Sequence, residues 1–80
     1  MLAKLAAVCT KQDNGSYFAY CPDIQACFAQ GDTYEDAIYC LRELAEDLIV
    51  HDLDDEDREY LVRPKERVFV EFEVNVTKKI

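Results

Sequence analysis

The sequence YFAYCPDIQACFAQGDTYEDA, residues 17–37, decides the fold of this chain. Residues 17–21 have the composition of a β-strand, and Pro22 ends that strand because proline has no amide hydrogen for a sheet to use. A short strand around residues 27–30 follows. The change from strand to helix is then marked by three residues typical of turns and caps, Gly31, Asp32 and Thr33. This order predicts two strands joined by a Pro-Asp turn, followed by a helix.

The predicted helix runs to about Val50 and is amphipathic. Asp32 with Glu35 has the spacing of a capping box, and Thr33 with Asp36 offers the same arrangement one residue later. The apolar stripe recurs at helical spacing and comprises Tyr34, Ala37, Ile38, Leu41, Leu44, Ala45, Leu48 and Ile49. The opposite face is acidic, with Tyr39 and Val50 projecting into its middle.

The segments on both sides of this unit add strands. Residues 2–10 have a β-compatible composition with apolar residues on both faces, and Asn14-Gly15 is a strong hairpin signal before the next strand. The acidic residues 51–62 could hold a short second helix, which Pro64 closes. Residues 67–77 then show the clearest strand alternation of the chain, with Phe69 as the apolar exception on the polar face.

These elements predict one domain over residues 1–80. The expected fold class is α+β, an antiparallel β-β-β-α-β sheet with one long amphipathic helix packed on a face. A domain of 80 residues has a small core, and self-association would stabilise it. We therefore expect a homo-oligomer.

The composition limits the classes of function. The net charge is −8, which disfavours general nucleic-acid binding and favours a basic partner. No apolar run has the roughly 20 residues needed to cross a bilayer, and we expect a cytoplasmic protein.

A metal site is not expected. The four cysteines are Cys9, Cys21, Cys27 and Cys40, and no two of them form a Cys-x-x-Cys pair. The only histidine is His51, well away from them in sequence, so we expect free thiols and no structural metal.

No catalytic constellation is apparent either. The acidic run after His51 lacks the glycine of a calcium loop, and two glycines in the whole chain exclude a phosphate-binding loop. We expect neither an enzyme nor a cofactor.

Surface residues for recognition remain. Helical geometry places Tyr39 among Glu35, Glu43 and Glu46, which makes it a candidate interface anchor, although a solvated tyrosine is the alternative. Phe69 is a candidate for a strand-edge or dimer contact. A local basic group, Arg63, Lys65 and Arg67, is a candidate for RNA contact or a solvated loop.

Residues 22–37 resemble the HicB-like antitoxin family. That family has a Pro-Asp-x-x-Gly-Cys turn and a Gly-Asp-Thr-x-Glu-Glu-Ala helix start, although Ala26 stands here where the family has glycine. The matching residues are Pro22, Asp23, Cys27, Gly31, Asp32, Thr33 and Glu35.

The resemblance implies a truncated ribonuclease H-like fold and an antitoxin function. Such antitoxins cover a small basic HicA-like toxin that cleaves messenger RNA. The resemblance does not extend to nuclease activity, because residues 2–10 contain no Asp or Glu to hold two metal ions. Many family members carry a DNA-binding segment after the last strand, and the sequence to Ile80 shows none, so we expect no direct DNA binding.

Three functions therefore stay open. The first is an antitoxin or stand-alone homologue that acts as a dimer or tetramer. The second is a small RNA-contacting module that uses the basic group. The third is a structural oligomer without a ligand of its own.

Overall fold

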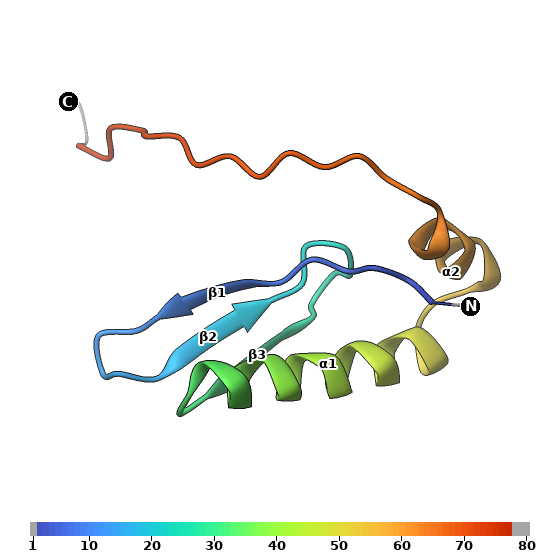
Figure 1. Ribbon diagram of the computed structural model, residues 1–80, viewed down its shortest axis with the longest axis horizontal. Coiled ribbons are helices and arrows are strands. Elements are labelled where there is room, and N and C mark those ends of the chain that lie inside the picture. Colours follow the sequence, from blue (N-terminus) through green and yellow to red (C-terminus); the bar gives the residue numbers. More distant parts are fainter. Residues whose placement is uncertain (1, 78–80) are drawn as a thin grey trace.

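The computed structural model describes residues 2–77. Three strands form an antiparallel sheet in the order β1-β2-β3, and two helices follow them along the chain (Figure 1). The elements are β1 (Val8–Lys11), β2 (Tyr17–Tyr20), β3 (Phe28–Gly31), α1 (Tyr34–His51) and α2 (Asp55–Val62). The predicted α+β class, with an antiparallel sheet and one long helix, is confirmed.

The β1–β2 hairpin turns where the sequence predicts it. Gly15 adopts a φ of 87°, and the Ser16 amide donates to the Asn14 side-chain oxygen at 3.0 Å. The register pairs Val8 with Tyr20, and Tyr20 with Phe28. Because side chains alternate along a strand, these three lie on one face of the sheet, whereas Cys9, Ala19 and Ala29 lie on the other.

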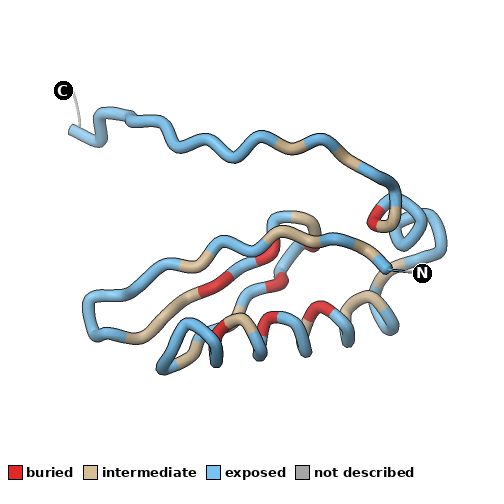
Figure 2. Tube along the Cα trace, viewed as in Figure 1, coloured by how far each residue is buried: buried red, intermediate tan, exposed pale blue. Residues whose placement is uncertain are grey.

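Helix α1 covers the face that carries Ala19. It packs mainly against β3 and then β2. Ala37, Leu41 and Ala45 of its apolar stripe are buried (Figure 2), whereas Tyr34 of that stripe is exposed. Alanine and cysteine predominate in the core, which comprises Ala19, Cys21, Ile24, Cys27, Ala37, Leu41, Ala45 and Leu61. The core is therefore built mostly from small side chains.

The helix N-termini are capped by side chains. The Thr33 hydroxyl accepts the amide hydrogen of Asp36 at 3.1 Å, so the Thr33–Asp36 arrangement is confirmed and Asp32 as N-cap is wrong. Thr33 has the extended backbone that an N-cap requires, with φ −125° and ψ 164°. The short second helix is also confirmed, and Asp54 caps it through the amide of Asp57 at 2.8 Å.

Residues 67–77 do not form the fourth strand that their alternation predicts. They run past β1 as an irregular chain without a partner strand (Figure 1). Their apolar side chains are exposed to between 69% and 90% for Val68, Val70, Phe72, Val74 and Val76. Alternation specifies an extended chain with two different faces, whereas a strand also needs hydrogen bonds to a neighbouring strand, and residues 67–77 have no such pairing. Residues 68–77 are called the C-terminal arm below, and its structure is described to Thr77.

Candidate functional site

The Pro-Asp turn is a compact loop over residues 21–27 that joins β2 to β3. The Cys21 amide donates to the Cys27 carbonyl at 2.9 Å, and the side chains of Cys21, Ile24 and Cys27 are buried. The motif residues Pro22 and Asp23 lie near the start of this loop, where Pro22 is exposed and Asp23 is half-buried. The loop is therefore anchored in the core, and Asp23 contacts neighbouring segments of the chain.

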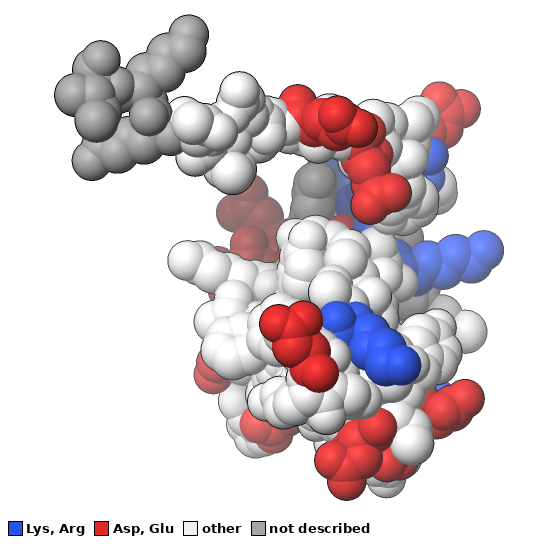
Figure 3. Space-filling model, turned by 90° about the vertical axis from the view of Figure 1, so that its left-hand side faces the viewer, with Lys and Arg blue, Asp and Glu red and all other residues white. Residues whose placement is uncertain are grey.

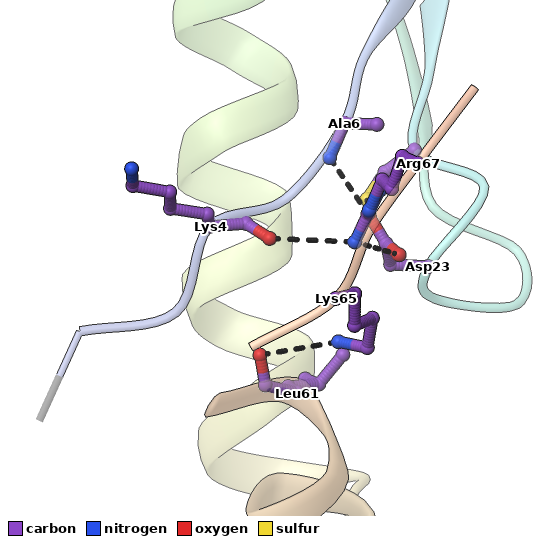
Figure 4. A network of polar contacts seen from close by, with 7 residues as sticks. Lys4, Ala6, Asp23, Leu61, Lys65 and Arg67 are labelled. Atoms are coloured by element: carbon purple, nitrogen blue, oxygen red, sulfur yellow. Dashed lines mark hydrogen bonds and ion pairs between the residues drawn. The ribbon is translucent and has the colours of Figure 1, made fainter. Parts of the chain in front are cut away.

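Asp23 is the centre of a network that joins three distant segments (Figure 4). Its carboxylate accepts two hydrogen bonds from Arg67, at 2.7 and 3.0 Å, and one from the Ala6 amide at 2.7 Å. Arg67 also donates to the Lys4 carbonyl at 3.4 Å. The side chains are only 11% exposed for Asp23 and 24% for Arg67. The bidentate pair thus fixes the start of the C-terminal arm beside the residues that precede β1.

The environment holds Asp23 in its ionised form. Partial burial raises the pKa of this carboxyl, but hydrogen bonds from Arg67 and Ala6 and the positive charges of Arg67 and Lys65 outweigh that effect. The net result is a pKa below the ordinary value. Asp23 is therefore a structural anion whose hydrogen-bonding capacity is occupied within the chain.

The cysteines are free thiols, and two of them line the same loop. Burial, together with the neighbouring Cys21, raises the pKa of the Cys27 thiol, which keeps it protonated and unreactive. Within residues 2–77, no three histidine, cysteine or carboxylate side chains come close enough together to hold a metal ion.

Ala26 occupies a position that suits glycine. Its φ of 63° lies in the left-handed region, where a side chain clashes with its own backbone. This is the position at which the HicB-like turn that these residues resemble has glycine, and alanine leaves strain in the loop.

We expect Ala26→Gly to raise the free energy of unfolding by about 0.5–1 kcal/mol, because relief of the left-handed strain exceeds the entropy that glycine adds to the unfolded chain. Urea denaturation measures the change. Ala7→Gly is the matched control, since Ala7 is exposed and has no positive φ. The control should be destabilised, and equal destabilisation of both variants would rule out strain at Ala26.

The other motif residues shape the junction between β3 and α1. Gly31 ends β3, and a Cβ atom there would lie 2.5 Å from the Ala37 amide nitrogen. Glycine is therefore required for the close approach of the first turn of α1. Asp32 and Glu35 are exposed beside it.

The predicted acidic stripe lies on the exposed side of α1. Tyr39 is 64% exposed, and Glu35, Glu43 and Glu46 are exposed as well. They follow one another every three or four residues, which places them along one side of the helix. Arg42 approaches Glu46 at 3.3 Å, but both side chains remain largely in solvent, so this pair adds little to stability. The stripe is thus a tyrosine surrounded by accessible carboxylates.

Phe69 lies apart from that stripe. It belongs to the segment that runs beyond β1, whereas α1 lies on the other side of the sheet (Figure 1). Its side chain is exposed, and its part in a strand-edge or dimer contact stays a prediction. The structure does not bring Phe69 and Tyr39 into one site.

The basic group is largely engaged within the chain. Lys65 donates to the Leu61 carbonyl at 3.4 Å and lies 4.6 Å from the centre of the Tyr60 ring, and Arg67 is paired with Asp23. Only Arg63 of the three is both exposed and outside these contacts. Of the three residues predicted to contact RNA, Arg63 is therefore the one left accessible for such a contact.

An aromatic cluster on the open face of the sheet was not predicted as a surface. Phe18 lies 6.4 Å from Tyr20 and 5.9 Å from Phe28, centroid to centroid. Tyr20, Phe28 and Val8 are exposed there, because α1 covers only the opposite face. The sequence indicated this face, since Phe18 and Tyr20 alternate with Tyr17, which packs against the core, and Ala19, which belongs to it.

A groove of about 820 Å³ lies between the segment before β1, α1 and α2. Its lining is mainly aliphatic and includes Leu2, Leu5, Ile38, Leu41, Ile49 and Leu61.

Within residues 2–77, no helix combines the length and apolar character needed to cross a membrane.

Comparison with known proteins gives a partial likeness. The chain is 44% identical over 36 residues to a UPF0150 protein of Synechocystis, a match that covers 45% of this chain and 46% of that protein. The chain thus matches less than half of the curated relative's length. No family model matches the chain. No solved structure matches it either.

Proposed function

We propose that this chain is a non-catalytic binding protein, a HicB-like antitoxin or a stand-alone homologue, that masks a small basic HicA-like toxin. The observation that carries the proposal is the exposed stripe on α1, in which Tyr39 stands among carboxylates. Similarity to a UPF0150 protein, whose length is close to that of this chain, fits this proposal. The Pro22–Ala37 motif supports the same family.

The electrostatics support a basic partner. With a net charge of −8, the protein attracts a cationic surface of the kind that binds RNA, and it presents carboxylates where RNA would present phosphates. Tyrosine supplies a large, stiff and amphipathic contact at the centre of such a surface. The acidic stripe would thus set the rate of association and Tyr39 the lifetime of the complex.

The environments of two titratable groups, Asp23 and Cys27, support a non-catalytic role. Asp23 is held by Arg67 and Ala6, and the Cys27 thiol is buried and protonated. Neither group is arranged to act as a base or a nucleophile toward a substrate.

Affinity purification tests the proposal. The tagged chain is recovered from its native host at moderate salt, and co-eluting proteins are identified by mass. We expect a small basic protein in near-stoichiometric amount. Recovery of the bait alone, at several salt concentrations, would count against a toxin partner.

Tyr39→Ala tests the surface. We expect it to weaken binding of that partner by about tenfold, mainly through faster dissociation, because a central aromatic anchor is lost. Calorimetry or surface plasmon resonance measures the affinity. Tyr60→Ala is the matched control, since Tyr60 is an exposed tyrosine on α2 and should leave the affinity unchanged. Equal effects of both variants would place the interface elsewhere.

A further inference from the structure

We propose that the C-terminal arm of one copy pairs as an added strand with the free edge of β1 in a second copy, so that two copies exchange arms. The inference concerns self-association and is independent of the partner proposed for α1.

The arm has the pattern of a strand but lies outside any sheet. It projects from the body of the molecule (Figure 3), and its five apolar residues at alternating positions are largely exposed. An extended apolar stripe with unpaired peptide groups is unfavourable in water and tends to pair with another strand. The arm therefore needs a sheet edge, and in this conformation it is not paired with the edge of β1 in its own chain.

The edge of β1 provides one. Within residues 2–77, β1 has a neighbouring strand only on the side of β2. The open face next to that edge carries exposed apolar side chains, namely Val8, Tyr20 and Phe28. An added strand with its valines on this face would extend the apolar surface, because cross-strand neighbours on one face contact each other. The opposite face offers no such match, since α1 already covers Ala19 and Ala29.

Charge favours the same pairing. Residues 2–12 contain Lys4 and Lys11 and no acidic residue, whereas the charged residues of positions 68–77 are Glu71 and Glu73, with Lys78 and Lys79 after them in the sequence. Lys11 of β1 could therefore pair with Glu71 or Glu73 across an added strand. The complementary segment is one that every copy of this chain carries, which makes a second copy the occupant.

The contact between Arg67 and Asp23, at the start of the arm, favours exchange of arms between two copies. Arg67 is held by both oxygens of Asp23, and beyond it the arm leaves its own sheet (Figures 1 and 4). Reciprocal exchange pairs two arms with two edges in a closed two-fold assembly, so that neither edge remains free for further growth. The additional burial also compensates for a small core of alanine and cysteine.

Light scattering during size exclusion tests the exchange. We expect wild type at twice its mass of 9.3 kDa, and we expect the double variant Val70→Lys/Phe72→Lys to be a monomer, with its dimer dissociation constant raised at least about tenfold. Circular dichroism should show unchanged helix, because these side chains are exposed in the single chain. Val50→Lys is the matched control, since Val50 is an exposed apolar residue of α1, and it should remain a dimer.

A second measurement locates the contact. Carbodiimide joins a carboxylate to an amine without a spacer, and it is applied to a mixture of isotope-labelled and unlabelled protein. Crosslinks between Lys11 and Glu71 or Glu73 of different copies are expected. A monomeric wild type, a dimer that survives the double variant, or crosslinks within single copies only would each overturn the proposal.

Discussion

Gly31→Ala is expected to lower the free energy of unfolding by about 3 kcal/mol, near the upper end of what overpacking costs. The new methyl group would lie 2.5 Å from the Ala37 nitrogen and 2.9 Å from the Asp36 carbonyl carbon. Both are backbone atoms in the first turn of α1, so neither can rotate away. The helix would have to move off β3, and the contacts of Ala37 with the core would loosen.

Urea denaturation of two glycine variants distinguishes steric crowding at the Cβ position from the cost of a left-handed backbone. Gly15 has a φ of 87°, but nothing lies within 4 Å of the position of its Cβ. Gly15→Asn should therefore change stability by less than about 0.5 kcal/mol, because asparagine tolerates the left-handed region. A Gly31→Ala variant as stable as Gly15→Asn would show that α1 does not approach β3 as closely as described.

Asp23→Asn is expected to lower the free energy of unfolding by about 1.5–3 kcal/mol at neutral pH, the range for hydrogen bonds to a charged group. The substitution keeps the size of the side chain and removes its charge. Arg67 then faces a neutral amide, and the Ala6 amide loses a charged acceptor. The segment before β1, the 21–27 loop and the start of the arm would be held together less firmly.

The pH dependence of the free energy of unfolding tests the Asp23–Arg67 pair more specifically. Because the pKa of Asp23 is lower in the folded chain, the folded state binds this proton less readily than the unfolded state. The stabilisation is therefore complete above the ordinary carboxyl pKa of 3.8 and is lost as the pH falls through the lower folded value. The difference between wild type and Asp23→Asn should stay constant from pH 7 to about 5 and shrink below about 4.

Asp13→Asn is the control for that profile. Asp13 is an exposed carboxylate in the hairpin turn, and its replacement should leave the acid limb of the stability curve unchanged. Parallel acid limbs for wild type and Asp23→Asn would mean that the pair with Arg67 contributes no pH-dependent stability.

Local signals in the sequence predict most of the fold. Asn14-Gly15 specifies the hairpin, Pro22 ends β2, and the stripe from Ala37 to Ile49 identifies the face of α1 that meets the sheet. Each of these depends on residues within a few positions of one another, so periodicity and turn chemistry are sufficient to find them. The sequence left Asp32 and Thr33 as candidates for the N-cap of α1, and the structure identifies Thr33 as the N-cap.

Long-range contacts account for what the sequence could not predict. Asp23 and Arg67 are 44 residues apart in sequence. The residues near Arg67 do not indicate whether it forms an ion pair within the chain or belongs to a basic surface patch. The alternation of residues 67–77 is equally clear whether the strand pairs within the chain, pairs with another copy or remains unpaired. Tyr39 and its carboxylates were placed correctly on one exposed side of α1, because helical spacing alone determines that arrangement.

The central proposal, that this chain silences a basic ribonuclease by binding it, is tested most directly by RNA cleavage. The basic protein that co-purifies with the chain is separated from it, and degradation of a messenger RNA is followed with and without the chain added back. We predict that the separated protein degrades the RNA and that a stoichiometric amount of the chain suppresses the degradation. A partner that leaves RNA intact, or that cleaves it equally well in the complex, would contradict the account.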